Sequence, residues 1–480
     1  MIAQRHPEFH LDEYLAGQIA SSPTKKKARF PGTSQMDAFA ALCEQVKKSF
    51  DQEWDEKGSD SDELLQMQKK AIIGYEAEVS LYKDRIRQIL KQQDLSGEWF
   101  PSWYKDLVSA LFAEVWGFAG VDEWLQDLES SSCKQVGERI YFLREGKMEL
   151  QPQRMKRDRM RQLITALMLN EPDKRMRNGY TEVYMLNGNR ITIYDSEIAK
   201  EPVIIYRKYV IQQYSFEEFA RKGTIPVESI DLWKSMVKVG FNVSKVGAVR
   251  TAKTSWLITW QSHEDPTLEG IQVETDPEIP LHVIMPNAPV IQLVADGDEL
   301  KQIVKSLMRS DGDYINMAEA RDGVALRIAV QAANKGTRRV KNTFHSSQPE
   351  DFCYDVANEI VQSYGGDVYA NTIKVAKAFH YVFHFIQLKD KSQKRLKGVY
   401  EIRYNPKTLQ ISMHRIMKYH FDTDSWTFAH DVGEDKKEIG MEEDPEAFRS
   451  FNEQLQHLAK QFPMQEDNTI LLPYLELMRR

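Results

Sequence analysis

The 480-residue sequence has few cysteines and no long apolar segment. Its three cysteines, Cys43, Cys133 and Cys353, lack the spacing of a disulfide framework or a zinc site, a pattern typical of proteins from a reducing cytosol. The longest conspicuously uncharged apolar run, residues 378–388, is far shorter than the roughly 20 residues that span a bilayer. Residues 1–17 carry acids and histidines where a signal peptide has its apolar core. Any contact with a membrane is therefore expected to be peripheral.

The sequence also lacks an excess of basic residues. There are 64 lysines and arginines against 71 acids, which gives a net charge of -7, so the overall field repels phosphate backbones and no direct binding of nucleic acid is expected. With 42% hydrophobic and 28% charged residues, the composition excludes collagenous, low-complexity and wholly disordered chains. At roughly 150 residues per domain, the length predicts about three folding units.

Changes in composition and in hydrophobic periodicity along the chain predict its domain organisation. The predicted parts are a flexible tail (1–35), a helical extension (36–104), an α+β N-terminal domain (105–210), an α/β domain (215–430), and an acidic linker with a C-terminal helix (431–480). In the extension, Leu65, Ile72, Val79 and Ile86 stand seven residues apart and predict one helix with a heptad-like stripe. That stripe fits either packing within the extension or docking of another subunit.

Two further segments have clear strand patterns. Residues 180–194 alternate around Asn187-Gly188, a strong signal for a β-hairpin. Residues 397–428 have the pattern of a small β-meander, and a final helix is predicted over about 445–462.

The sharpest local motif is G-A-V-R-T-A-K-T, Gly247 to Thr254, which precedes an apolar segment. A phosphate-binding loop needs inward-facing backbone N–H groups at a helix N-terminus, a lysine for the phosphates and a hydroxyl for Mg²⁺. Lys253 and Thr254 supply the last two, but Ala252 stands where the pattern G-x-x-x-x-G-K-[ST] has its second glycine. Taken alone, the octapeptide fits an ordinary turn before a helix equally well.

Three predicted strands after this loop end in an acid or a histidine. Their ends are V-E-T-D-P-E (273–278), Y-I-N-M-A-E (314–319) and N-T-F-H (342–345). Parallel strands present their carboxyl ends at one edge of a sheet, so these groups are expected to converge on a nucleotide held by Lys253.

This succession resembles the type II/type IV secretion-system traffic ATPases, and most closely their tight-adherence, CpaF-like branch. In that family a Walker A loop is followed by an Asp box, a Walker B segment and a His box. The matching segments here are ETDPE (274–278), AEARDGVAL (318–326) and NTFHSSQPED (342–351). Upstream segments 114–127, 133–150, 186–191 and 203–209 are also similar to the family. The resemblance covers roughly residues 110–430 and implies a RecA-like P-loop NTPase domain after a smaller α+β domain.

The resemblance assigns roles to individual residues. It makes Gly247, Ala248, Val249, Arg250, Thr251, Ala252, Lys253, Thr254 and Ser255 the ATP-binding loop, with Thr254 as the Mg²⁺ ligand. It makes Glu319 the Walker B acid, Glu278 with Glu274 part of the Asp box, and His345 the γ-phosphate sensor. It gives Arg190 and Arg207 the role of closing the N-terminal domain over the nucleotide.

Several positions depart from the family pattern. Thr275 replaces the Asp-box aspartate, Ala252 replaces the Walker A glycine, and Thr337 and Arg339 replace a histidine and a glycine. Because phosphoryl transfer depends on positioning, such a loop could bind ATP and hydrolyse it slowly.

The family implies an ATPase motor subunit that couples ATP hydrolysis to domain closure. It would form a homo-oligomer, a hexamer in the family, and would act on an inner-membrane platform protein of a pilus or secretion system. It would lie in the cytoplasm, at the inner face of the membrane. The alternatives are a nucleotide-binding but non-hydrolysing scaffold subunit and a conjugation-type transfer ATPase.

Overall fold

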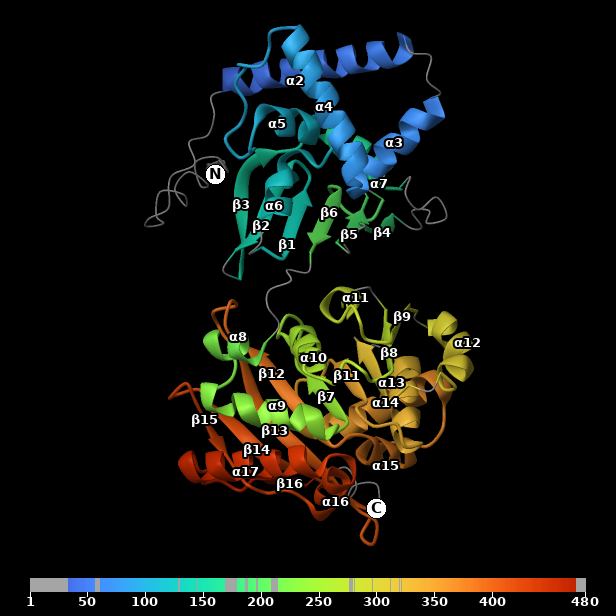
Figure 1. Ribbon diagram of the computed structural model, residues 1–480, viewed down its shortest axis with the longest axis vertical. Helices are drawn as coiled ribbons and strands as arrows, with labels where there is room; N and C mark the ends of the chain where they lie inside the picture. The colour runs from blue at the N-terminus through green and yellow to red at the C-terminus, as the bar shows by residue number, and fades with distance from the viewer. Residues whose placement is uncertain are drawn as a thin grey trace, which may run out of the picture. The chain divides into compact units, whose positions relative to one another are not determined.

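The computed structural model describes most of the chain. The described residues are 33–56, 61–127, 130–144, 146–168, 179–185, 189–195, 197–208, 215–275, 279, 281–295, 297–310, 312–318, 320 and 322–471. Residues 1–32, which make up nearly all of the predicted tail, lie outside this set. The chain divides into two compact units, the first made of residues up to 142 with 149–207, and the second of residues 143–148 with those from 208 onward. Each is described below by itself (Figure 1).

The first unit begins with a helical layer. Its helices are α2 (Thr33–Glu56), α3 (Ser61–Ile73), α4 (Glu76–Gln92), α5 (Leu107–Val115), η1 (Ala119–Val121), α6 (Asp122–Gln126) and α7 (Arg157–Met168). The single heptad helix predicted from Leu65 to Ile86 is wrong, because Gly74 adopts a φ of 103° and separates α3 from α4. Tyr82 of α4 stacks on Phe50 of α2, with ring centroids 5.1 Å apart, in a core built from α2, α4 and α5.

A six-stranded sheet completes the first unit. Its strands are β1 (Ser132–Val136), β2 (Arg139–Arg144), β3 (Lys147–Arg154), β4 (Tyr180–Tyr184), β5 (Arg190–Tyr194) and β6 (Val203–Arg207), in the order β3-β2-β1-β6-β5-β4. The predicted hairpin is confirmed, since β4 and β5 pair antiparallel from Tyr180–Tyr194 to Tyr184–Arg190. Its turn, residues 186–188, lies outside the described residues. One buried core joins this sheet to α6 and α7.

The second unit is a mixed α/β structure. Its helices are α8 (Phe216–Arg221), η2 (Val227–Ser229), α9 (Ile230–Val239), α10 (Lys253–Ser262), α11 (Leu281–Ile284), α12 (Gly297–Leu307), α13 (Gly323–Asn334), η3 (Pro349–Asp351), α14 (Phe352–Tyr364), α15 (Val368–Ala378), α16 (Glu434–Glu443) and α17 (Pro445–Gln461). Its strands are β7 (Val243–Val246), β8 (Gly270–Glu274), β9 (Val290–Val294), β10 (Tyr314–Ala318), β11 (Lys341–Phe344), β12 (Tyr381–Gln387), β13 (Lys394–Asn405), β14 (Gln410–His420), β15 (Ser425–Phe428) and β16 (Thr469–Leu471).

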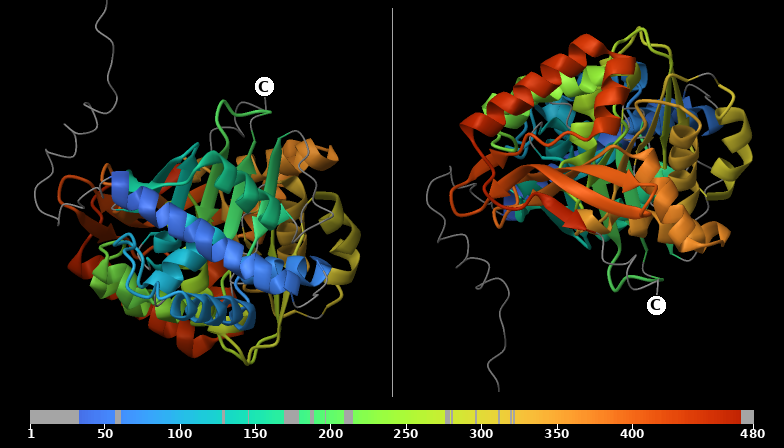
Figure 2. Two further views of the ribbon diagram at one scale, coloured as in Figure 1. Left: turned by 90° about the horizontal axis from the view of Figure 1, so that it is seen from above. Right: turned by 90° about the horizontal axis from the view of Figure 1, so that it is seen from below.

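All ten strands form one sheet. The order is β15-β14-β13-β12-β7-β11-β10-β8-β9, and β16 pairs with β14. In this sheet order, the six strands β9, β8, β10, β11, β7 and β12 run parallel to their neighbours. Strands β12, β13, β14 and β15 pair antiparallel. The meander predicted over 397–428 is confirmed, since β13, β14 and β15 pair antiparallel in succession, and it extends the main sheet beyond β12. The acidic segment after residue 431 contains helix α16, and α17 packs against α9 (Figure 2).

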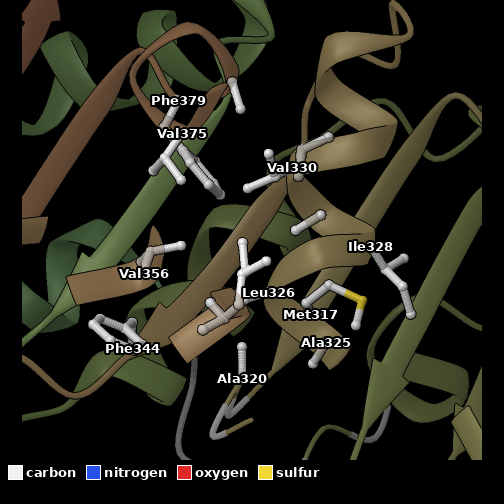
Figure 3. Close-up of a cluster of buried hydrophobic side chains, with 14 of the residues drawn as sticks. Met317, Ala320, Ala325, Leu326, Ile328, Val330, Phe344, Val356, Val375 and Phe379 are labelled. Carbon is white, nitrogen blue, oxygen red and sulfur yellow. The ribbon is translucent and has the colours of Figure 1, made fainter. Parts of the chain in front are cut away.

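Helices cover both faces of the sheet. Helices α13, α14 and α15 bury one face, where Met317 of β10 and Phe344 of β11 meet Leu326 of α13 (Figure 3). Helices α8, α9, α10 and α17 bury the other, around Trp233, Trp256 and Trp260. Strands β7, β8, β10 and β11 are buried along their whole length, as expected for parallel strands with helices on both faces of the sheet. Among the described residues, no helix combines the length and apolarity needed to cross a bilayer.

Candidate functional site

The carboxyl ends of the central parallel strands meet at one edge of the sheet. The last residue of β7, Val246, pairs with Phe344 of β11 on one side and with His384 of β12 on the other. Farther along, Ala318 of β10 pairs with Glu274 of β8. The loop after β7 and the histidine after β11 therefore start from the same edge, at which β8 and β10 also end. Edges of this kind are the usual place for a ligand in open α/β sheets.

Gly247 turns the chain out of β7 into the loop. Its φ is 143°, in the region that favours glycine. A Cβ atom at this position would lie 2.2 Å from the carbonyl oxygen of Phe385 in β12, far inside van der Waals contact. Only glycine lets the loop start this close to the neighbouring strand, which explains why the first position of the motif is a glycine.

Two residues of the loop hold left-handed backbone without being glycine. Arg250 has a φ of 63°, and Ala252 has φ 76° and ψ 19°. Left-handed backbone costs an L-residue roughly 1–2 kcal/mol. Ala252 stands where the motif has its second glycine, and the backbone there adopts the conformation that glycine suits best. The loop therefore keeps this turn at an energetic cost.

The side chain of Lys253 folds back over the loop. Its Nζ donates to the carbonyl oxygens of Gly247 at 2.8 Å and Ala248 at 2.7 Å, and the residue is 7% exposed. The same Nζ lies 3.4 Å from Nδ1 of His345, the residue that follows β11. The structure thus brings two of the predicted site residues into direct contact. The Lys253 ammonium carries the charge that would neutralise a phosphate, whose oxygens would replace the two loop carbonyls as its acceptors.

The remaining loop residues complete a short turn whose tip, residues 248–250, is exposed. Thr251 is buried and its Oγ1 donates to the Ala248 carbonyl at 2.8 Å, which closes the loop on itself. Val249 at the tip is 68% exposed, a large value for an apolar side chain. Thr254 and Ser255 are half-buried in the first turn of α10. Their backbone N–H groups lie at a helix N-terminus, where anions are favoured.

The acidic members of the predicted site are only partly described. Glu278 and Glu319 lie outside the described residues. Glu274 ends β8, is buried, and accepts the backbone N–H of Ile279 through Oε2 at 3.0 Å. Thr275 Oγ1 is buried and has no hydrogen-bond partner within the described part of the chain.

Sequence reasoning gave no role to Asp322, which lies within the predicted Walker B segment, 318–326. Its carboxylate accepts from the backbone N–H groups of Val324 and Ala325 at the start of α13, at 3.0 and 2.9 Å, and from Gly297 at 3.2 Å. It thereby caps α13 and ties α12 to the same edge of the sheet. An Asp directly before a helical apolar run is the signal that could have revealed it.

Arg190 and Arg207 belong to the first unit. They are direct cross-strand partners, at the start of β5 and the end of β6, and Arg190 is buried. Like charges opposite each other in a sheet are unfavourable. Arg is suited to bidentate binding of phosphate.

The loop carries groups that fit a phosphate and a divalent cation. Among the described residues, no group of three or more His, Cys, Asp or Glu side chains is arranged to hold a metal ion. The Thr254 hydroxyl, the N-terminus of α10 and the Lys253 ammonium are the donors and ligands that Mg²⁺ and a nucleotide polyphosphate require.

Comparison with solved structures finds distant similarity in chain fold. The pilus retraction motor PilT with bound ADP matches at 13% identity and a TM-score of 0.44, over 71% of this chain and 92% of that one. The Legionella pneumophila ATPase DotB matches at 15% identity and a TM-score of 0.39, over 75% and 90%. The VirB11 ATPase from the Brucella suis type IV secretion system, solved with sulphate, matches at 15% identity and a TM-score of 0.32, over 58% and 92%. No protein-family model and no curated protein sequence matches the chain. At these scores the similarity carries no argument about function.

Proposed function

We propose that this protein is an ATPase motor subunit of a bacterial type IV pilus or type II-like secretion machine. One observation carries the proposal: the segment Gly247–Thr254 forms a turn between a central parallel strand and a helix, with Lys253 folded over it and His345 beside it. This is the arrangement that binding of a nucleotide polyphosphate requires.

In this proposal each group has a defined task. The N–H groups at the start of α10 and the Lys253 ammonium bind the β- and γ-phosphates of ATP. Mg²⁺, when bound, neutralises phosphate charge that develops during transfer, and the Thr254 hydroxyl would hold it. Glu319 orients the attacking water, Glu278 and Glu274 support it, and His345 senses the γ-phosphate next to Lys253. Arg190 and Arg207 bind the phosphates from the first unit, so that ATP draws the two units together and hydrolysis releases them.

The wider assembly follows from the same proposal. The chain would act as a homo-oligomer, with six subunits as in the family that its motifs resemble, and would transmit domain closure to an inner-membrane platform protein. Its place would be peripheral, at the cytoplasmic face of the cell membrane. The cargo would be pilin-like subunits or an exported protein. A conjugation-type transfer ATPase shares these parts, and neighbouring genes for pilins or for a relaxase would separate the two.

The proposal is tested by ATP turnover. The purified full chain is expected to release phosphate from ATP in the presence of Mg²⁺, and Glu319→Gln is expected to lower that rate by at least a hundredfold while ATP still binds. Equal rates for the two proteins would show that the motor hypothesis is wrong.

A second candidate function is supported by the two strained loop positions. Arg250 and Ala252 hold left-handed backbone, and Thr275 replaces a carboxylate beside the site. These features favour a subunit that binds ATP and hydrolyses it slowly, as a scaffold or regulator. Tight ATP binding with turnover that is no faster than in Glu319→Gln would favour this role.

A further inference from the structure

His345 lies on a short irregular connection between a strand and a helix. Strand β11 ends at Phe344 and η3 begins at Pro349, and residues 345–348 of this described stretch have neither helical nor strand backbone. His345 is exposed, and its Nδ1 lies 3.4 Å from Nζ of Lys253. A side chain on such a connection keeps its place only if contacts of the connection itself hold it there.

The residue after His345 makes such a contact. Ser346 is 8% exposed, and its Oγ lies 3.0 Å from Oδ2 of Asp355, in the first turn of α14. The same oxygen lies 3.0 Å from the carbonyl oxygen of Gln348 and accepts the Gln348 N–H at 3.4 Å. A hydroxyl has one proton to donate, and a carboxylate is a stronger acceptor than a carbonyl, so we assign the Ser346 proton to Asp355.

Helix α14 is fixed on two sides, so Asp355 is a firm anchor. Val356 of α14 is fully buried in the core that also contains Phe344 of β11 (Figure 3). One turn after Asp355, the carbonyl oxygen of Glu359 lies 2.2 Å from the position that a Cβ atom would take at Gly323. Helix α14 therefore lies directly against the start of α13 and cannot shift toward it.

We propose that Ser346 and Asp355 are positioning residues that hold His345 beside Lys253 and so set the response of the site to the γ-phosphate. The inference rests on the function proposed above, in which His345 contacts that phosphate. The bond from Ser346 to Asp355 fixes the backbone one residue after His345, which makes the place of the imidazole independent of the exposed residues 347 and 348. A displacement of about 1 Å is enough to weaken a contact of this kind severely.

This role predicts an effect on the γ-phosphate and not on the rest of the nucleotide. ADP lacks the phosphate that His345 contacts, so ADP affinity is expected to be independent of Asp355. An ATP analogue with a nitrogen bridge between the β- and γ-phosphates, which is not cleaved, is expected to bind less tightly when Asp355 or Ser346 is changed. The ratio of analogue affinity to ADP affinity therefore reports on the imidazole, and it is measurable whether or not the protein hydrolyses ATP.

The experiment is calorimetric titration of the full chain with the imido analogue and with ADP, each in the presence of Mg²⁺. Asp355→Ala and Ser346→Ala are each expected to lower the affinity ratio about tenfold, the size of one charge-assisted contact. Asp355→Asn keeps an acceptor for the Ser346 hydroxyl and is expected to lower the ratio less. Glu359→Ala removes another half-buried carboxylate of α14, serves as the matched control and is expected to leave the ratio unchanged.

A double-mutant cycle separates positioning from a general loss of structure. If Asp355 acts through His345, then Asp355→Ala is expected to change the ratio no further in a chain that already carries His345→Ala. A full additional loss in that chain would overturn the inference, because Asp355 would then act by another route. Loss of ADP affinity in Asp355→Ala, to the same extent as analogue affinity, would also overturn it.

Failure of this inference and failure of the proposed function give different results. If the unchanged protein binds neither nucleotide, both are wrong. If it binds both nucleotides and hydrolyses no ATP, the motor is wrong and the affinity ratios still decide the role of Asp355. If Lys253→Gln weakens both nucleotides but Asp355→Ala and Ser346→Ala keep the full ratio, nucleotide binding stands and only the positioning role is wrong.

Discussion

The Nζ atom of Lys253 lies 3.4 Å from Nδ1 of His345, although 92 residues separate them in the sequence. The contact exists because β7 and β11 are parallel neighbours whose last residues, Val246 and Phe344, are register partners. The next residue after β11 thus meets the lysine at the start of the helix that follows β7. A change of charge at a phosphate bound by Lys253 would act directly on the histidine.

The first prediction concerns the phosphate lysine. Lys253→Gln removes an ammonium that donates two hydrogen bonds to loop carbonyls and would also bind the phosphates. Since a hydrogen bond from a charged group contributes roughly 1.5–3 kcal/mol, ATP affinity is expected to fall by about ten- to a hundredfold. Calorimetry measures the change, and Lys238→Gln, an exposed lysine at the end of α9, is the control. Unchanged ATP affinity in Lys253→Gln would contradict the proposed site.

The second prediction concerns the left-handed alanine. Ala252→Gly is expected to raise the free energy of unfolding by about 0.5–1 kcal/mol, because relief of the left-handed strain exceeds the extra entropy of glycine in the unfolded chain. ATP affinity is expected to rise or stay equal. Ala248→Gly is the matched control, since Ala248 is an alanine of the same loop without a positive φ, and it is expected to lower the free energy of unfolding. Urea denaturation measures both, and a destabilised Ala252→Gly would argue against this backbone conformation.

The third prediction concerns the start of the loop. Gly247→Ala places a methyl group 2.2 Å from the Phe385 carbonyl oxygen, which belongs to the backbone of β12 and can move only with its strand. Clash and strain together are expected to lower the free energy of unfolding by roughly 3 kcal/mol and to abolish ATP binding.

Gly297→Ala separates the two contributions to that loss. Gly297 also has a positive φ, of 45°, but no atom lies within 4 Å of its Cβ position, so only the strain applies. Its loss of stability is expected to be about 1 kcal/mol, with ATP binding retained. Equal losses in Gly247→Ala and Gly297→Ala would show that the contact with β12 is unimportant.

Much of the candidate site is predictable from the sequence for one physical reason. Strand, loop and helix around Gly247–Thr254 are contiguous, so local pattern suffices to place Lys253 at a helix start. The parallel sheet then brings His345 to the same edge, because all carboxyl ends of parallel strands point one way.

Other features depend on pairing between distant segments and leave no local signal. Glu264 is buried between Arg339 and Lys341, at 2.5 and 2.7 Å, yet in the sequence all three are ordinary charged residues. Strand β12 lies beside the loop at Gly247, yet the sequence pattern does not assign it to the main sheet. The sequence does not predict the break between α3 and α4, because the heptad spacing of apolar residues continues across Gly74. A pattern of apolar side chains does not reveal the change in backbone direction at that glycine.

The last prediction concerns acid stability and the buried His384 of β12. Burial, and to a smaller extent the charge of Lys397, lowers the pKa of His384 to about 4, below the value of about 6.5 in an unfolded chain. The unfolded chain therefore binds the proton more readily, so the contribution of this histidine is complete above pH 6.5 and is lost as the pH falls from about 6.5 toward 4. At about 1.4 kcal/mol per pH unit, the loss of folding free energy at pH 5 that comes from His384 is about 2 kcal/mol.

His384→Gln is expected to reduce the fall in the free energy of unfolding between pH 7 and pH 5 by that amount. His380, whose pKa is also lowered by burial, remains in both proteins, so the difference between their urea denaturation curves isolates His384. Parallel losses of stability in the two proteins would mean that His384 is protonated equally in the folded and unfolded chains.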